Sequence, residues 1–199
     1  MLFFAREKLV LLSVPKTGTT AWQAALGDRA SLVVRDPPEL KHAPLYRYNR
    51  FFRPMFEKFC DGPIEIVAVV REPVSWLGSW FRYRTRPFLA GRPTSTQGLD
   101  FDAFVRGYLE EAPPPWARVG SQAAFLAPRP NGARVDRLFR YEAPEALRAF
   151  LDRLEAPIGF LDFEATCTAI PPFDRLRPWE HIPYLYSLHR EDEDGLLEH

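Results

Sequence analysis

The stretch Leu9-Val10-Leu11-Leu12-Ser13-Val14-Pro15-Lys16-Thr17-Gly18-Thr19-Thr20 passes from an apolar run directly into a short polar loop. The apolar run, residues 9–14, is typical of a strand buried on both faces of a parallel sheet, and Pro15 ends it. A helix is predicted from Thr19 to about Leu26, because Gly27 is a typical C-terminal stop. A buried strand followed by a loop and a helix indicates the first unit of an α/β fold.

Strands and helices continue to alternate along the chain. Further strands are predicted at residues 31–35, 64–70 and 134–141. A helix of about twelve residues is predicted to begin at Pro73, since proline favours the first helical turn. Other predicted helices cover residues 46–59, with a break or kink near Pro54, and residues 101–111, 121–126 and 144–154. The alternation predicts a single α/β domain with a mainly parallel central sheet flanked by helices.

The last part of the chain, residues 155–199, has no clear hydrophobic period. We therefore predict an irregular tail that belongs to the same domain. Its final residues, Leu-Glu-His at 197–199, have the composition of an expression-tag remnant and are left out of the functional argument.

Composition excludes several classes of protein. The chain has 199 residues, of which 46% are hydrophobic and 14% aromatic, so neither a disordered nor a fibrous protein is expected. No apolar run approaches the roughly 20 residues of a membrane span, and the start of the chain is too quickly charged for a signal peptide. The two cysteines, Cys60 and Cys167, are too few for a zinc ribbon or a disulfide scaffold. A cytoplasmic location is predicted.

The charge is zero overall but unevenly distributed. Residues 1–100 contain 15 Lys and Arg against 9 Asp and Glu, whereas residues 101–199 contain 11 against 17. A basic first half favours an anionic ligand there. A protein that coats nucleic acid would usually be basic overall, so no nucleic-acid partner is predicted.

The loop after the first strand has the composition of an anion site. Backbone N–H groups at a helix start bind an anion, Gly18 permits close approach, and Lys16 adds a full positive charge. The pattern differs from the NTPase loop GxxxxGK[ST], because lysine here precedes the only glycine by two residues. An ordinary turn between a strand and a helix is the alternative interpretation.

Two other strand ends carry polar residues suited to binding or catalysis. Arg71 follows the strand 64–70, and its guanidinium suits a phosphate, although a structural ion pair is the alternative. Ser79 lies eight residues later, on the polar stripe of the helix that begins at Pro73. His42 follows the strand 31–35 and is a candidate base or a structural histidine. The neighbouring stripe of that helix, Trp76, Trp80 and Tyr83, is interpreted as core packing.

Together these motifs resemble those of the sulfotransferases that use 3′-phosphoadenosine-5′-phosphosulfate (PAPS), in particular the small bacterial members. Residues 15–20 resemble the family's 5′-phosphosulfate loop, and Arg71 with Ser79 resembles its 3′-phosphate motif. The segment Phe139-Arg140-Tyr141-Glu142 is similar to a later strand-end segment of the family. The resemblance extends from about residue 9 to residue 154. The family usually has Lys-x-His where this chain has Lys41 and His42 adjacent.

The resemblance implies a P-loop-like architecture and transfer of a sulfuryl group from PAPS to a hydroxyl or amine, leaving the desulfonated nucleotide PAP. It implies that Lys16 and His42 are catalytic and that no metal is required. The implied nucleotide-binding residues are Lys16, Thr17, Gly18, Thr19, Thr20, Arg71, Ser79 and Tyr141. It does not identify the acceptor, which is a carbohydrate, a lipid, a phenol or a protein side chain, or the oligomeric state.

Two other functions are compatible with these residues. An ATP-dependent kinase on the same scaffold needs a strand-end carboxylate for Mg²⁺, and Asp36 is the reasonable candidate. A nucleotide-binding or polyanion-binding protein without catalysis is the second alternative.

Overall fold

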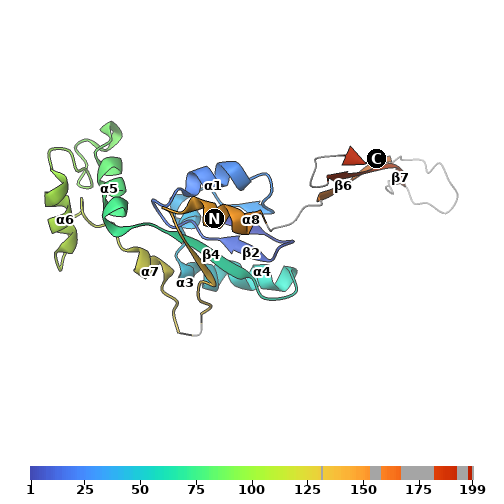
Figure 1. The fold of residues 1–199 in the computed structure, drawn as a ribbon, viewed down its shortest axis with the longest axis horizontal. Helices are drawn as coiled ribbons and strands as arrows, with labels where there is room; N and C mark the ends of the chain where they lie inside the picture. Colours follow the sequence, from blue (N-terminus) through green and yellow to red (C-terminus); the bar gives the residue numbers. More distant parts are fainter. Residues whose placement is uncertain (131, 153–157, 167–181, 192–196, 199) are drawn as a thin grey trace. The chain divides into compact units, whose positions relative to one another are not determined.

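The computed structural model describes residues 1–130, 132–152, 158–166, 182–191 and 197–198, with side chains for residues 1–130 and 132–152 (Figure 1). The chain divides into two compact units, Met1–Ala149 and Phe150–His199. That the two units belong to a single domain stays a prediction.

The first unit is built on a five-stranded sheet of mixed direction. Its strands are β1 (Leu2–Phe4), β2 (Leu9–Leu11), β3 (Leu32–Val33), β4 (Glu65–Val70) and β5 (Arg137–Arg140), in the spatial order β3-β1-β2-β4-β5. β4 runs parallel to β2 on one side and to β5 on the other, whereas β1 is antiparallel to both of its neighbours. The predicted α/β class is confirmed.

The prediction of a mainly parallel sheet is wrong, because β1 was missed. A three-residue strand is too short to show a period in the sequence, although all of its side chains are buried. The tight turn between β1 and β2 includes a hydrogen bond from the Lys8 amide to the Ala5 carbonyl at 3.3 Å, and Lys8 has a φ of 50°. So short a connection makes a hairpin, and the strands of a hairpin are necessarily antiparallel.

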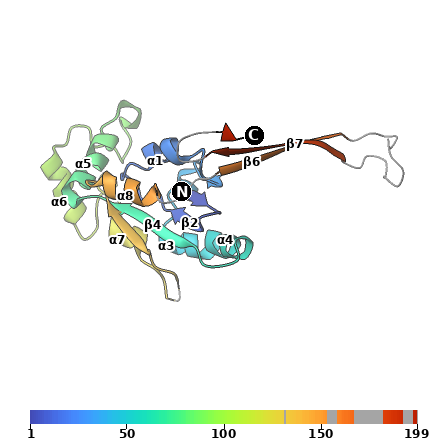
Figure 2. The ribbon, with the colours of Figure 1, turned by 45° about the vertical axis from the view of Figure 1, so that its right-hand side comes forward.

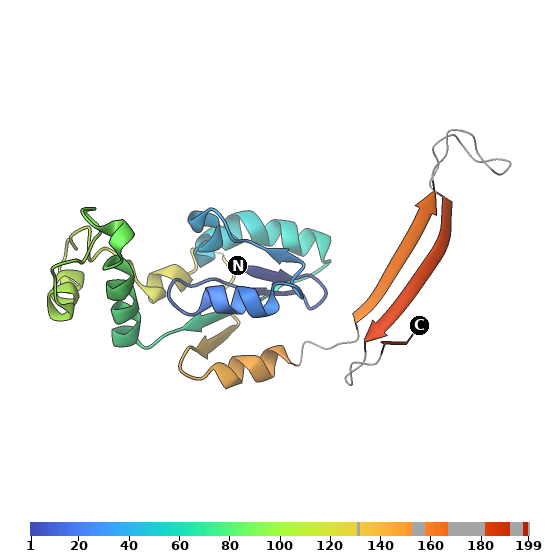
Figure 3. The ribbon, with the colours of Figure 1, turned by 90° about the horizontal axis from the view of Figure 1, so that it is seen from above.

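Side chains alternate between the two faces of the sheet, and helices cover both faces (Figure 3). On one face, Phe3, Val10 and Ile66 pack with residues of the helical segment 45–59, where the Phe3 and Phe56 rings stack at 3.7 Å. The opposite face carries α1 (Thr19–Leu26), whose residues Trp22 and Gln23 line a small space together with Leu11 and other sheet residues. Burial on both faces explains the uninterrupted apolar runs of β2 and β4.

The helical segment after His42 continues through Pro54, where a break or a kink was predicted, and changes to a π-helical stretch just before it. It comprises α3 (Leu45–Arg47), a π-helical stretch (Tyr48–Phe52) and α4 (Arg53–Phe59). Proline lacks an N–H group and clashes with the carbonyl four residues earlier. The wider π turn immediately before Pro54 accommodates this constraint without ending the helix. A shorter helix, α2 (Pro38–Lys41), precedes this segment.

Two further helices form a second small core beyond β4. Figures 1 and 2 show α5 (Pro73–Arg84) and α6 (Phe101–Leu109) side by side. The buried residues of this core are Trp76, Leu77 and Phe104 from the two helices and Ala117 from the segment after α6. The predicted start and length of α5 are confirmed, and the Glu72 carboxylate caps the helix by accepting the amides of Val74 and Ser75. A 3₁₀ turn (Pro87–Leu89) and α7 (Gln122–Leu126) follow α5 and α6.

The second unit contains an antiparallel sheet in the segment predicted to be irregular. β6 (Ile158–Thr166) pairs with β7 (Ile182–Glu191), and β7 pairs with β8 (Leu197–Glu198). The proposed tag remnant therefore includes a paired strand. The chain reaches this unit through α8 (Pro144–Leu151), which ends earlier than the predicted limit at residue 154.

In the part of the chain that the structure describes, no helix is long and apolar enough to cross a bilayer. Cys60 is a free, half-buried thiol, and Cys167 lies outside the described residues. The cytoplasmic location stays a prediction.

Gly107 tests the packing of α6. A Cβ atom at this position would lie 2.6 Å from Cζ3 of Trp116, too close for two carbon atoms. Because the indole is packed into the second core, we expect Gly107→Ala to lower the free energy of unfolding by about 1–3 kcal/mol, measured by urea and thermal unfolding. Arg106→Ala, at an exposed position of the same helix, serves as the control and should change stability by less than about 0.5 kcal/mol. Unchanged stability of Gly107→Ala would contradict this packing.

Candidate functional site

The predicted site residues meet in one cavity of the first unit. The cavity has a volume of about 890 Å³ and opens where the chain leaves β2, β4 and β5. Ligands of α/β proteins commonly bind at such carboxyl ends of parallel strands. Its lining includes all predicted site residues except Thr17, namely Lys16, Gly18, Thr19, Thr20, His42, Arg71, Ser79 and Tyr141.

Thr17 has a structural position in the loop. Its side chain is fully buried, and its hydroxyl donates to the Val14 carbonyl at 2.9 Å. The side chain closes the turn that follows β2 and does not line the cavity. The sequence places hydroxyl residues on both sides of Gly18, but it does not show which of these side chains are buried in the protein.

The loop at residues 15–20 presents its amides as hydrogen-bond donors. Lys16 and Gly18 have φ values of 67° and 76°. The Trp76 indole N–H donates to the Pro15 carbonyl at 2.9 Å, and the Arg71 guanidinium donates to the Lys16 carbonyl at 3.4 Å. Within the described residues, the N–H groups of residues 16–20 have no acceptor. Consecutive free amides at a helix start form a concave anion site.

The Lys16 ammonium rests against aromatic rings. Its Nζ lies 3.4 Å from the ring centroid of Tyr83 and 4.7 Å from that of Trp80, both on α5. It makes no ion pair with any residue that the structure describes. Burial, and after it the charges of Arg86 and Arg84, lowers the pKa of Lys16 to about 8. The aromatic stripe that was predicted to be core packing is core at Trp76, and Trp80 also packs against that core. Trp80 and Tyr83 in addition contact Lys16 and line the cavity.

Arg71 is held by neighbours that the sequence analysis missed. Its Nε donates to Ser75 Oγ at 2.8 Å. The side-chain amide of Gln122 accepts a hydrogen bond from the backbone N–H of Arg71 and donates one to the backbone carbonyl of Arg71, both at 2.8 Å. The guanidinium carbon lies 4.4 Å from the ring centroid of Tyr141. No sequence signal identified Gln122, because it acts from a helix 51 residues away.

Tyr141 lies against the loop as well as against Arg71. A Cβ atom at Gly18 would lie 3.1 Å from Cε2 of Tyr141, and the φ of Gly18 disfavours any side chain there. Glycine is thus required both for the backbone conformation and for the approach of this ring. The three strand-end segments that follow β2, β4 and β5 are in direct contact.

His42 has one tautomer suited to accept a proton. Its Nδ1 lies 2.7 Å from the Ser13 carbonyl. A carbonyl oxygen only accepts hydrogen bonds, so Nδ1 carries the proton and Nε2 has the free lone pair. Burial, together with the charges of Lys41, the N-terminal amine and Lys16, lowers the pKa of His42, against a raising effect of the Ser13 carbonyl. His42 is therefore neutral near pH 7, and it lines the cavity.

Charged residues that were not predicted as site residues also line the cavity. Arg35, Glu39, Lys41 and Arg47 line the same cavity, and Lys41 Nζ donates to Thr20 Oγ1 at 3.2 Å. None of these cations makes an ion pair within the described residues. The excess of Lys and Arg over Asp and Glu in residues 1–100 was the sequence feature that indicated these cations. Asp36 also lines the cavity, but the described residues contain no cluster of three or more side chains able to hold a metal ion.

Comparison with known proteins concerns another part of the chain. A family model described as a domain of unknown function, DUF2779, matches residues 159–199. No curated protein and no solved structure matches the chain. The match lies within the second unit, Phe150–His199, and includes none of the residues that line the cavity.

The state of His42 can be measured directly. In long-range ¹H–¹⁵N spectra at pH 7.5, we expect the neutral tautomer with the proton on Nδ1, assigned by comparison with His42→Asn. The titration midpoint should lie below the ordinary histidine value of about 6.5. Because the folded state resists protonation, His42 should reduce the free energy of unfolding as the pH falls below about 6.5. A proton on Nε2, or a midpoint above that value, would contradict this geometry.

Proposed function

We propose that this protein transfers a sulfuryl group from PAPS to a hydroxyl or amine. The observation that carries the proposal is the convergence of unpaired loop amides, Lys16, Arg71 with Ser79, and a neutral His42 in one cavity. Each has a counterpart in the sulfotransferase motifs that the sequence resembles. The P-loop-like architecture belongs to this proposal.

The residues present fit a ligand with two separate phosphate groups. The free amides of residues 16–20, with Lys16 beside them, suit a 5′-phosphosulfate. The Ser79 hydroxyl makes no hydrogen bond with the described residues and lines the cavity with Arg71. A guanidinium and a hydroxyl suit a 3′-phosphate. The cavity volume falls within the range usual for nucleotide-sized ligands.

PAPS would supply the activated sulfuryl group, bound through oxygen to its 5′-phosphate. In the proposed reaction, Nε2 of His42 takes the proton from the acceptor hydroxyl while the acceptor oxygen bonds to sulfur. The bond between sulfur and the bridging oxygen breaks, and the negative charge passes to PAP. The Lys16 ammonium offsets that charge as it develops, since its position next to the loop amides directs it there.

A second candidate function is an ATP-dependent phosphotransfer. It is favoured by Asp36, whose side chain lines the same cavity and is able to contact Mg²⁺ held by a nucleotide. This alternative explains neither the arginine at the end of β4 nor the free Ser79 hydroxyl. A binding protein without catalysis would use the same anion site but would not need the neutral His42.

Nucleotide preference separates these functions. We expect PAP to bind at least about tenfold more tightly than AMP in calorimetric titrations without Mg²⁺, because Arg71 and Ser79 contact the additional 3′-phosphate. Ser79→Ala should remove much of that preference while leaving AMP affinity unchanged. Arg71→Ala should weaken both nucleotides, since Arg71 also holds the Lys16 carbonyl of the loop.

Ser95→Ala is the matched control, because the Ser95 hydroxyl contacts the Arg84 carbonyl outside the cavity lining. It should leave both affinities unchanged. Equal affinity for PAP and AMP in the wild type, or binding seen only with ATP and Mg²⁺, would support the kinase function instead.

Turnover tests the two catalytic assignments. With PAPS and either a simple phenol or a simple sugar as trial acceptor, His42→Ala should slow PAP release by roughly 10²–10⁴ while PAP affinity hardly changes. Lys16→Ala should abolish release, whereas Lys58→Ala, at an exposed lysine outside the cavity, should not affect it. Wild-type rates in the Lys16 variant would refute its role. PAP binding without turnover of any acceptor by the wild type would favour the non-catalytic function.

A further inference from the structure

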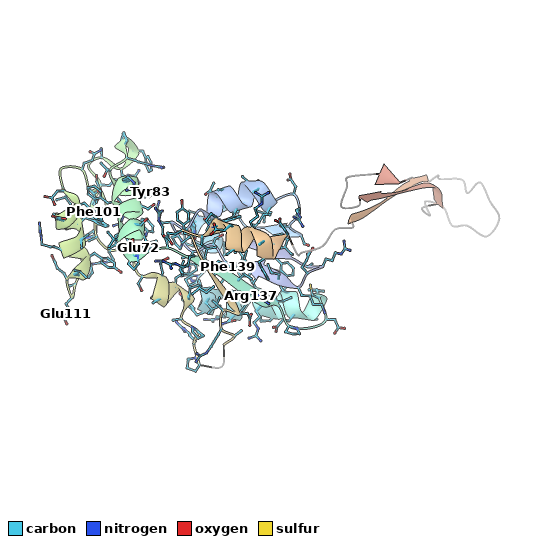
Figure 4. All side chains as sticks on the ribbon, in the orientation of Figure 1. Glu72, Tyr83, Phe101, Glu111, Arg137 and Phe139 are labelled. Carbon is cyan, nitrogen blue, oxygen red and sulfur yellow. The ribbon has the colours of Figure 1, made fainter. Side chains whose placement is uncertain are left out.

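Two rings on one helix surround the Lys16 ammonium. Tyr83 and Trp80 lie on α5, and their rings meet edge-on at 6.0 Å with an interplanar angle of 82°. Tyr83 is one helical turn beyond Ser79, and Figure 4 labels it near the end of α5 opposite to Glu72. Lys16 Nζ lies closer to the Tyr83 ring centroid, at 3.4 Å, than to the Trp80 centroid, at 4.7 Å.

Most charged groups of the cavity around Lys16 are positive, and its two acidic residues, Asp36 and Glu39, form no ion pair with Lys16. Arg84 and Arg86 come from α5 and its end, Arg71 contacts the Lys16 carbonyl, and Lys41 and the neutral His42 come from the segment after β3. No carboxylate forms an ion pair with Lys16 among the described residues. A half-buried ammonium in such surroundings tends to lose its proton.

Each ring also contacts an arginine. The Arg86 guanidinium carbon lies 5.2 Å from the Tyr83 centroid, and that of Arg84 lies 5.6 Å from the Trp80 centroid. The negative faces of the two rings are therefore the groups in contact with Lys16 that favour its charged form. Arg84 is fixed in place because its guanidinium donates to the carbonyls of Pro115 and Arg118.

We propose that Tyr83 is a positioning residue that keeps the Lys16 ammonium charged and beside the phosphate loop through its ring face. The effect of Tyr83 on the charge of Lys16 does not depend on the proposed function. One consequence rests on that function, namely that Tyr83 sets the upper pH limit of nucleotide binding. The hydroxyl of Tyr83 has no part in it. The inference differs from the sulfotransferase resemblance, which assigned no role to this position.

The sign of the pH dependence follows from the direction of the shift. Lys16 is charged below its pKa of about 8 and neutral above it. PAP affinity should therefore begin to fall as the pH rises through about 8, and Lys16→Ala should remove this alkaline decline. A ring-face contact with a cation is equivalent to roughly a 2- to 5-fold change in the protonation equilibrium, or about 0.3–0.7 pH unit.

The test is a set of calorimetric PAP titrations from pH 6.5 to 9.5. Tyr83→Phe keeps the ring and should retain the wild-type midpoint. Tyr83→Leu and Tyr83→Met, which fill the space without a ring, should move the midpoint down by about 0.5 pH unit. Phe101→Leu is the matched control, because Phe101 packs edge-on against Phe81 in the same core, and neither ring contacts Lys16 or the Pro15 carbonyl. It should leave the midpoint unchanged even if stability falls.

A second measurement needs no nucleotide. The ¹³Cε resonance of Lys16, assigned by comparison with Lys16→Arg, reports its pKa in the free protein. A lower pKa in Tyr83→Leu and Tyr83→Met, but not in Tyr83→Phe, would support the inference even if the wild type failed to bind PAP, which would refute only the proposed function. An unchanged Lys16 pKa in both ring-free variants, or an equal decrease in Tyr83→Phe, would overturn it.

Discussion

The hydrogen bond from the Trp76 indole to the Pro15 carbonyl joins the second core to the loop that follows β2. Trp76 is buried with Phe104, so its indole cannot turn away without disturbing that core. Arg71 donates to the carbonyl of the next residue, Lys16. These two hydrogen bonds turn the carbonyls of Pro15 and Lys16 toward α5 and its start. The amides that follow are left without protein acceptors, and the anion site depends on this.

The cavity gathers positive charge that the protein neutralises only in part. Lys16 rests on the Tyr83 ring, Arg71 on the Tyr141 ring, and Lys41 donates to a hydroxyl. Rings and hydroxyls orient these cations, but they leave most of the charge available to a ligand. His42 stays neutral in the same surroundings, because each additional proton would lie near existing positive charge. Positive charge that forms no ion pair within the described part of the chain, next to a neutral histidine, is the chemical character of this site.

Much of the candidate site was predictable because it lies at strand ends. The positions of Lys16, His42 and Arg71 follow from where apolar runs stop, and the ends of parallel strands meet at one edge of a sheet. The Thr17 hydroxyl closes the turn and only its amide is left free, which the sequence does not show because neighbouring hydroxyl residues look alike. Tyr83 and Gln122 were missed because an aromatic stripe is usually core and a lone glutamine carries no pattern.

The sequence by itself determined the buried strands β2 and β4, the starts of α1 and α5, and the loop between β2 and α1. These features depend on neighbouring residues: an apolar run, a proline at the first turn, or a glycine with positive φ. Only the tertiary structure decided the direction of β1, the tautomer of His42 and the partners of Lys16. His42 meets a carbonyl 29 residues away, and the Trp76 indole meets one 61 residues away. Contacts over such separations depend on how the elements pack, and no local pattern encodes them.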